Sequence, residues 1–486
     1  MQLSIEGLLV VLALYLLDRA LDGRLVIALL MSLAFGATAF ATLPALGGSS
    51  PLIYTIFALA LGVVFVRRRD FVPELARLFR INPIGWAIVL IIVYALMGAI
   101  ILPRLFAGAT TVYVVERGAT GTAGVVPVRL APGTYNVSQA AYFALAAASY
   151  FTVLSVAIAP GGLRRLRIAI FAWAIMIAAT GYIDLIGKLA GLGDILEPIR
   201  TASYTMLTGE DNTISGLPRI SGAFSEASGF SAVSVPAAAF ALSYWRVLRT
   251  PLVLFLFLLL LVLVLLSTST TAYVTLVICT AWLCLAAIIR LLLARIDGAD
   301  LVLIGLALLV VAVVTGIYLY DPNVFSPFLQ MLDEMLIHKS TSSSAIERGE
   351  WNEQGLRAFL DTFGGGVGIG STRTSSWAVA VVAQLGVLGA LALAGILVVL
   401  VNGAGRVSVT RESRPLLALA NGCRAAALAG LVSDALTSST SDPGMFFYIA
   451  LATIVAVSRE LAARRVSLFR SLPVTDMPQP DTLRNA

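Results

Sequence analysis

The chain alternates long apolar runs with short polar or basic segments along most of its length. The runs hold about 17 to 25 residues, the length that an α-helix needs to cross the ~30 Å hydrocarbon core of a bilayer. The pattern predicts about thirteen membrane-spanning helices. We place them near residues 4–18, 25–46, 51–66, 84–103, 138–159, 166–187, 229–246, 250–267, 271–293, 300–320, 376–401, 416–437 and 443–459.

The composition also separates the chain from soluble proteins. Apolar residues make up 59% of it and charged residues 12%, against about 45–50% and about 25% in soluble domains. We therefore expect an all-α polytopic membrane protein, with one helical bundle over residues 1–460 and a disordered tail over 461–486. The first run lacks a small-residue cleavage site, so we interpret it as a retained helix rather than a signal peptide. The three cysteines show no spacing typical of a metal site or a disulfide framework.

The basic residues indicate the topology. The net charge is +6, but these residues form short clusters between the apolar runs, which argues against a nucleic-acid partner. All the clusters fall on one side of the predicted bundle, and the positive-inside rule makes that side the cytoplasm. The N-terminus is then predicted on the opposite side and the C-terminus in the cytoplasm. The clusters are at 67–70, 161–167, 245–249, 290–295, 406–414 and 459–465.

Three long connections fall on the side opposite the basic clusters, at 104–137, 188–228 and 321–375. Loops of this length inside a compact bundle are usually functional. The first contains "TTVYVVERG" and "GVVPVRLAPG", two β-prone pieces that either pair as a hairpin or stay irregular, since two strands alone are only marginally stable.

The second connection ends in "SGLPRISGAFSEASGF", residues 215–230. Arg219 is expected near the outer membrane surface, where a guanidinium binds phosphate in a bidentate manner. Glu226 follows in the candidate first turn of the next helix. The alternative is that the two charges only pair with each other or with water.

The third connection carries more polar residues, over 338–377: "HKSTSSSAIERGEWNEQGLRAFLDTFGGGVGIGSTRTSSW". We predict a helix from about 343 to 361 that lies on the outer membrane surface. Its apolar side is expected to hold Ile346, Trp351, Leu356, Phe359 and Leu360.

A glycine run, "GGGVGIGS", occupies 364–371. Backbone amides free of side chains, such as those of Gly368 and Gly370, suit an oxyanion when a helix follows. Arg348 and Arg373 stand on either side of the run. The alternative is a turn with no ligand.

Other ionisable residues remain as candidates. His338, the one histidine of the chain, titrates near neutrality and is a candidate general base, or a solvated loop residue. Asp184, Arg424 and Asp434 fall within predicted spans, where charges are costly and often functional. Because they are expected near helix ends rather than at the midplane, they weaken the interpretation of an ion-coupled transporter.

Several of these segments together resemble a known family. "RISGAFSEASGF" before a span, "LLSTSTTAY" at 265–273, and "SSSAIERGEW" leading through "FLDTFGGGVGIGSTRTSS" to "LGVLGALAL" are similar to the bacterial O-antigen polymerase and ligase superfamily, in particular to Wzy-type exopolysaccharide polymerases. The resemblance implies an inner-membrane protein of GT-C-like architecture with two large periplasmic loops that carry short helices.

The resemblance also implies roles for residues. Members use undecaprenyl-diphosphate-linked glycans as donors and need no metal or other cofactor, so Arg219 and Arg348 are expected to bind the donor diphosphate, with Arg373 as a third contact. Glu226 is the candidate proton acceptor and His338 the competing one. The "HKSTSSS" segment departs from the loop histidine pattern of the ligases, which favours a polymerase.

We therefore expect a periplasmic-face polysaccharide polymerase. The alternatives are a ligase of the same superfamily, which transfers a finished glycan to a lipid or protein acceptor, and a non-catalytic transporter or lipid-linked glycan flippase. The expected partners are lipid-linked donor and acceptor glycans and membrane lipids, with a chain-length regulator and a flippase as further candidates.

Overall fold

The computed structural model describes residues 2–43, 48–117, 123–203, 213–214, 217–293, 343–402 and 412–471, with scattered positions between 298 and 319. Within these residues, eight helical segments are long and apolar enough to cross a membrane. Two shorter apolar helices accompany them, α3 (Ile53–Val66) and α9 (Pro251–Leu266). The chain is an all-α polytopic membrane protein with little sheet. The eight segments are α5 (Ile84–Leu105), α6 (Thr134–Ile158), α7 (Gly162–Leu189), α8 (Ala227–Leu248), α10 (Thr270–Leu292), Trp377–Asn402, α16 (Arg414–Thr437) and the Met445–Arg465 part of α17 (Met445–Ser471).

The remaining elements are short or lie outside the bundle. Three two-stranded antiparallel sheets pair β1 with β2, β3 with β4 and β5 with β6. The helices are α1 (Ile5–Ala20), α2 (Val26–Ser32), α4 (Phe71–Ile81), α13 (Ser343–Asp361) and the 3-10 turn Glu197–Ile199, and the strands are β1 (Gln2–Leu3), β2 (Ala41–Thr42), β3 (Thr111–Arg117), β4 (Ala123–Arg129), β5 (Thr213–Ile214) and β6 (Leu217–Pro218).

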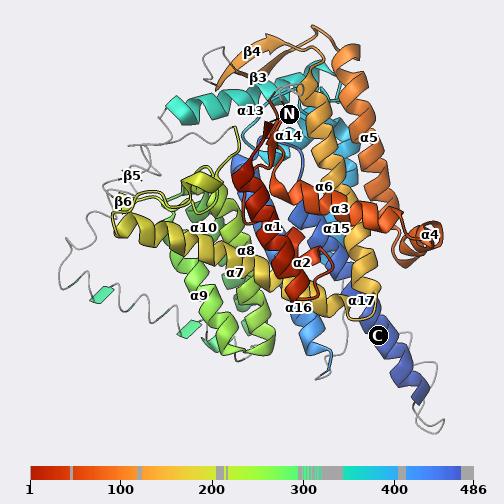
Figure 1. Cartoon of the computed structure of the whole chain (residues 1–486), viewed down its shortest axis with the longest axis vertical. Helices are drawn as coiled ribbons and strands as arrows, with labels where there is room; N and C mark the ends of the chain where they lie inside the picture. The colour runs from red at the N-terminus through yellow and green to blue at the C-terminus, as the bar shows by residue number, and fades with distance from the viewer. Residues whose placement is uncertain are drawn as a thin grey trace.

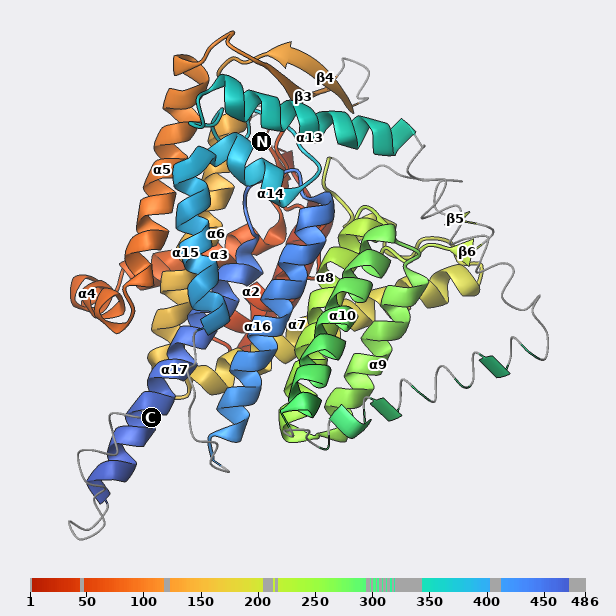
Figure 2. The same cartoon turned by 180° about the vertical axis from the view of Figure 1, so that it is seen from behind.

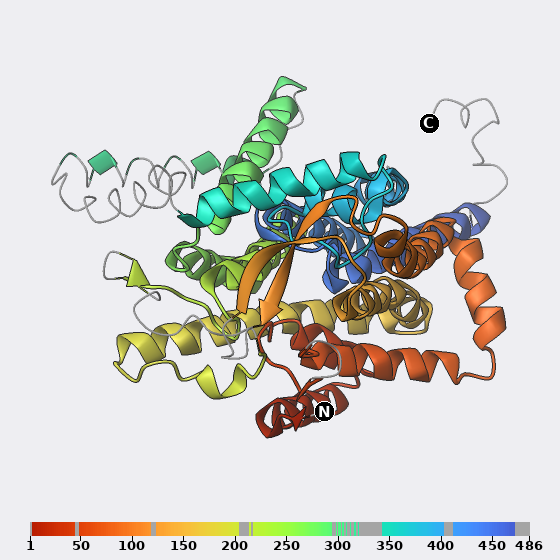
Figure 3. The ribbon, with the colours of Figure 1, turned by 90° about the horizontal axis from the view of Figure 1, so that it is seen from above.

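Most of the long helices lie side by side, while α7 is inclined across them and α4 lies apart at the side of the bundle (Figure 1). The β3–β4 hairpin and α13 lie at one end of the bundle, whereas the C-terminal part of α17 projects from the opposite end (Figures 1 and 2). Viewed from above, α13 and the hairpin cross over the ends of the bundle helices (Figure 3). We call the end that carries α13 the α13 end.

In the first long connection the structure decides between the two alternatives: β3 and β4 form a hairpin that pairs from Thr111 with Arg129 to Arg117 with Ala123. In the third, α13 covers the residues predicted to be helical. The face of α13 that packs against the protein includes Gly355 and Ala358, which are buried, because small residues allow close approach to neighbouring elements. Ile346, Leu356 and Leu360, on the apolar side predicted to lie on the membrane surface, are exposed.

Close helix contacts form the core of the bundle. Phe240 in α8 is fully buried, and a Cβ at Gly422 of α16 would lie 2.7 Å from its ring. Glycine and alanine on α16 therefore let the two helices approach, as small residues do between membrane helices. Large apolar side chains such as Leu90, Leu252 and Trp282 point outward and are exposed, as expected for surfaces that face lipid.

The spanning helix predicted over 25–46 is wrong. Helix α2 ends at Ser32, all seven of its residues are buried, and the chain then turns back to pair β2 with β1. This apolar run reflects burial within the protein rather than passage through lipid. The span predicted over 300–320 lies largely outside the described residues.

The short helix α2 begins on a buried carboxylate. Asp18, at the end of α1, is 1% exposed. Its Oδ2 accepts the amide of Leu25 at 2.8 Å, and its Oδ1 accepts the amides of Ile27 and Ala28 at 3.1 Å. These amides have no partner inside the helix, so Asp18 satisfies the first turn of α2 and complements its dipole.

Replacing this carboxylate tests its structural role. We expect Asp18→Ala to lower the free energy of unfolding by about 2 kcal/mol or more, because three backbone amides, two of them in buried hydrogen bonds, lose a charged acceptor. The apparent Tm of the purified protein in detergent should fall. Asp22→Ala is the matched control, since Asp22 pairs with Arg165 at the surface and its side chain is 77% exposed, where ion pairs contribute little. Equal Tm values for the two variants would contradict the capping role.

Candidate functional site

Four charged residues from three distant segments meet in the structure. Burial lowers the pKa of Arg219, and the charge of Glu226 opposes this shift. Burial also lowers the pKa of Arg373; the nearby charge of Arg348 lowers it further and that of Glu226 opposes it. The charge of Glu226 thus acts on both Arg219 and Arg373, and the charge of Arg348 acts on Arg373, so these interactions link the four residues, all of which were predicted from the sequence. We call them the arginine cluster.

Helix α7 fixes the backbone around Arg219. The Nζ of Lys188 donates to the carbonyl oxygen of Arg219 at 2.6 Å. The Oδ2 of Asp184 accepts the amides of Ser221 and Gly222 at 2.8 and 3.0 Å. Residues 219–221 have no regular secondary structure, so these side chains determine the path of the loop.

Helix α13 and strand β3 place the other two arginines. The amide of Arg373 donates to the carbonyl oxygen of Tyr113 in β3 at 2.7 Å, and the amide of Ser375 donates to Oδ1 of Asn352 in α13 at 2.8 Å. The guanidinium of Arg373 lies 5.0 Å from the centroid of the Trp351 ring, a cation–π contact. Trp351 follows Arg348 on α13, so this contact ties Arg373 to the helix that carries Arg348.

Sequence reasoning assigned Trp351 to an apolar helix face and missed its contact with the cluster. The separation of Trp351 and Arg373 along the chain gives no signal for such a contact.

The cluster retains hydrogen-bonding capacity. The Nε atoms of Arg219 and Arg373 are buried and have no hydrogen-bond partner within the described part of the chain. Buried polar atoms are normally paired. Two buried guanidinium donors beside a third arginine therefore form an environment that suits an anion with several oxygens.

Glu226 stands at the N-cap of α8. Its backbone is extended, with φ −150° and ψ 159°, and its carbonyl oxygen accepts the amide of Phe230 at 3.1 Å. The side chain makes no capping hydrogen bond to α8 and is partly exposed. The N-cap position thus fixes the backbone of Glu226, while its carboxylate makes no hydrogen bond to the first turn of α8.

The glycine run packs against a break in a helix. The Trp377–Asn402 span consists of α14 (Trp377–Ala380), a π-helical turn (Val381–Leu385) and α15 (Gly386–Asn402). The amide of Val367 donates to the carbonyl oxygen of Ala383 at 2.8 Å, and that of Gly368 to Gln384 at 3.0 Å. The run therefore satisfies carbonyl groups that the break leaves without helical partners.

This packing corrects the role predicted for Gly368 in a phosphate cradle. The Gly368 amide is already bonded to the carbonyl oxygen of Gln384, so the expectation that it binds the diphosphate is wrong. At Gly370, a Cβ would lie 2.9 Å from the carbonyl oxygen of Tyr135, so close packing requires glycine there as well. Gly386 shows the same constraint, with φ +63° and a Cβ position 2.4 Å from the carbonyl oxygens of Gly364 and Gly365.

The π-helical turn also supports the segment before Arg373. The Nε2 of Gln384 donates to the carbonyl oxygen of Thr372 at 2.9 Å, and its Oε1 accepts the hydroxyl of Ser441 at 3.0 Å. Gln384 is 1% exposed. One buried amide side chain thus joins the glycine segment to the connection between α16 and α17.

The other predicted candidates lie elsewhere. His338 falls outside the described residues. Arg424 donates to the carbonyl oxygen of Leu400 at 2.9 Å and to Oδ1 of Asn421 at 3.0 Å, which are contacts within the bundle. Asp434 lies near Asp442 at the end of α16. Asp184 belongs to the surroundings of Arg219.

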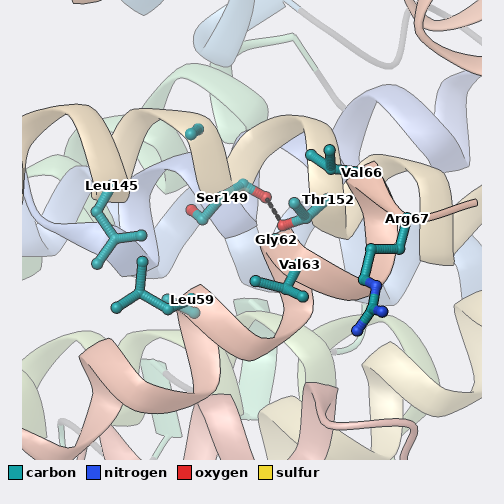
Figure 4. Close-up of a pocket in the computed structure, with 10 residues that line it drawn as sticks. Leu59, Gly62, Val63, Val66, Arg67, Leu145, Ser149 and Thr152 are labelled. Carbon is teal, nitrogen blue, oxygen red and sulfur yellow. Dashed lines mark hydrogen bonds between the residues drawn. The ribbon is translucent and has the colours of Figure 1, made fainter. Parts of the chain in front are cut away.

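A groove of about 390 Å³ lies between α3 and α6 (Figure 4). Its lining is apolar apart from Arg67 and the hydroxyls of Ser149 and Thr152, and the Thr152 hydroxyl donates to the carbonyl oxygen of Ser149. None of the lining residues belongs to the arginine cluster. The groove is suited to an apolar chain rather than to catalysis.

Within the described residues, no group of three or more His, Cys, Asp or Glu side chains is placed to hold a metal ion. No protein-family model matches the chain, and no curated protein matches it. The arginine cluster is therefore interpreted from its own geometry and chemistry.

One titratable group near the α13 end escaped sequence reasoning. Asp442 lies in the connection between α16 and α17, and its Oδ1 accepts the amide of Gly444 at 2.9 Å. Burial raises the pKa of its carboxyl group to about 7. The ordinary pKa of an aspartate is 3.8, so the folded state favours the protonated form.

This shift makes stability depend on pH. Because the folded pKa is the higher one, the contribution of Asp442 is fully present below pH ~4 and is lost as the pH rises through ~7. We expect the apparent Tm of the protein to fall between pH 5 and pH 8, and to fall less in Asp442→Asn, which keeps an acceptor for Gly444 but does not ionise. A parallel pH dependence in both proteins would show that Asp442 does not contribute.

Proposed function

We propose that the protein is a polysaccharide polymerase that joins undecaprenyl-diphosphate-linked repeat units. The observation that supports this proposal is the arginine cluster, in which the charge of Glu226 acts on Arg219 and Arg373 and the charge of Arg348 acts on Arg373. A diphosphate diester carries a negative charge on each phosphate, so the net charge of the cluster complements it. Arginine binds such oxygens through its planar fork of donors.

The proposed reaction is glycosyl transfer. The hydroxyl oxygen of the acceptor glycan forms a bond to the anomeric carbon of the donor. The bond from that carbon to the diphosphate oxygen breaks, and its electron pair leaves with undecaprenyl diphosphate. Arg219, Arg348 and Arg373 stabilise the negative charge that develops on this leaving group. Glu226 accepts the proton of the attacking hydroxyl.

The proposal includes a topology. We infer the predicted spans other than the one over 25–46, a GT-C-like arrangement and a place in the bacterial inner membrane, with the α13 end in the periplasm and the C-terminus in the cytoplasm. The arrangement of basic clusters supports this orientation. A chain-length regulator and a flippase are the partners that such a polymerase would need.

Two other functions follow from related chemistry. A ligase would use the same diphosphate site but transfer a finished glycan to a lipid or protein acceptor. A transporter or flippase would instead need charges along a path through the bundle. Asp184, the fully buried intramembrane carboxylate that the sequence singled out, contacts the Arg219 loop, which favours transfer chemistry at the α13 end.

Removing arginines from the cluster tests the donor site. We expect Arg219→Ala and Arg348→Ala each to slow chain extension at least about 100-fold, because each removes a charged donor to the leaving group. Lysine should restore little, since a point charge does not replace the planar fork. Chain extension is measured by gel analysis of glycans from proteoliposomes supplied with undecaprenyl-diphosphate-linked repeat units.

The matched control for these variants is Arg357→Ala, which removes an arginine from the same helix as Arg348. The side chain of Arg357 is 65% exposed and pairs with Glu353, so activity should be retained. Full activity in Arg219→Ala and Arg348→Ala, with protein levels in the membrane unchanged, would contradict the proposed donor site.

Replacing Glu226 tests the proton acceptor. We expect Glu226→Gln to slow chain extension at least about 100-fold while leaving donor affinity close to that of the wild type, as loss of a general base does. Glu353→Gln, a change of the same kind on the exposed face of α13, should be neutral. Retained activity in Glu226→Gln together with loss in His338→Gln would assign the role to His338 instead.

A further inference from the structure

Asp184 is completely buried near the C-terminal end of α7, and it accepts hydrogen bonds from the loop that follows Arg219. Its Oδ2 accepts the amides of Ser221 and Gly222. These are the second and third residues after Arg219. A charged acceptor forms bonds about twice as strong as a neutral one, so the carboxylate holds this stretch of backbone firmly.

Lys188 lies one helical turn further along α7. Its Nζ is 2.8 Å from Oδ1 of Asp184 and donates to the carbonyl oxygen of Arg219 at 2.6 Å. The pair therefore contacts the backbone of the Arg219 loop at three points from one face of one helix. The side chain of Lys188 is only 11% exposed.

Arg200 holds the same loop from another side. Its Nε donates to the carbonyl oxygen of Gly222 at 3.1 Å, and its Nη2 to the hydroxyl of Ser221 at 3.2 Å. Arg200 in turn pairs with Asp194. Gly222 has φ +52°, and a Cβ there would lie 2.8 Å from the ring of Phe230, so the loop has little room to shift.

A buried ion pair is weak evidence of a role in stability, because apolar residues of similar volume often serve a fold as well or better. The bonds made by Asp184 and Lys188 are instead directed at the backbone next to one guanidinium. The side chain of Arg219 itself keeps a buried Nε without a partner in the described part of the chain. The pair thus fixes the backbone and leaves the guanidinium available.

We propose that Asp184 and Lys188 are positioning residues that hold Arg219 in the diphosphate site. This inference rests on the proposed function, since it assigns the pair a part in donor binding. It adds two residues of a membrane helix to a site whose other members lie in the long connections.

A double-mutant cycle with undecaprenyl diphosphate as the probe tests the inference. We expect Arg219→Ala and Asp184→Asn each to weaken binding to the protein in nanodiscs by about tenfold. If Asp184 acts through Arg219, the double variant should bind no more weakly than Arg219→Ala alone, because the two changes remove one interaction. Losses that multiply in the double variant would overturn the inference.

Hydrogen exchange supplies a second readout that does not depend on function. We expect the amides of Ser221 and Gly222 to exchange about tenfold faster in Asp184→Asn, because a neutral acceptor holds them less firmly. If this variant does not fold, Asp184→Asn combined with Lys188→Met removes both charges and leaves no buried charge unpaired. Unchanged exchange at these amides in a folded variant would also overturn the inference.

Asp18→Asn is the matched control, since Asp18 is likewise a buried carboxylate that accepts backbone amides. It should speed exchange near residues 25–28 but not at 221–222, and it should leave binding unchanged. If the wild type fails to bind undecaprenyl diphosphate, the proposed donor is wrong. Exchange at 221–222 then decides whether Asp184 holds the loop.

Discussion

Like charges that share a partly buried site repel one another, and this repulsion is the constraint on which the α13 end depends. Two unit charges about 4 Å apart near a protein surface interact by roughly 4 kcal/mol. Burial lowers the pKa of Arg373, and the nearby charge of Arg348 lowers it further. Left to themselves, flexible arginines would move apart into solvent. The structure prevents this by fixing the backbone of each segment separately.

The three anchors differ in kind. Arg219 is held through its own carbonyl oxygen by Lys188, and Arg348 lies within a regular helix. Arg373 depends on a more unusual device, the break in the Trp377–Asn402 span. The π-helical turn leaves carbonyl groups without helical partners, the glycine run satisfies them, and Gln384 binds the carbonyl oxygen of Thr372 directly before Arg373. The glycine run thus fixes the backbone path that leads to Arg373.

The sequence predicts a helix or strand correctly where a local pattern of residues can arise in only one way. Bilayer thickness fixes the length of apolar runs, so the eight long helices were found. The helical pattern of α13 and the alternation of β3 and β4 are local as well. The apolar run at 25–46 misled because burial in protein and burial in lipid select the same residue types.

The residues of the candidate site also differ in how far the sequence predicts them. Arg219, Glu226, Arg348 and Arg373 were found because charged residues in an apolar chain are conspicuous. The structural role of Gly368 was not predicted, because the sequence does not show which carbonyl groups accept its amide. The contacts of Trp351 with Arg373 and of Asp184 with Ser221 depend on tertiary packing between distant segments. Hydrophobic periodicity carries no information about such pairs.

The placement of the buried charges bears on the kind of function that the fold can support. A transporter needs ionisable groups that face a path through the membrane, where each is costly unless it is paired or solvated. Here Asp184 accepts hydrogen bonds from Lys188 and from the amides of Ser221 and Gly222. Arg424 donates to Leu400 and Asn421. These charges are committed to holding the structure in place. In the arginine cluster, the buried Nε atoms of Arg219 and Arg373 have no hydrogen-bond partner within the described residues. An anion bound there would relieve the repulsion between the arginines, and in the proposed reaction a leaving diphosphate would relieve it most, because its negative charge grows as its bond to the anomeric carbon breaks.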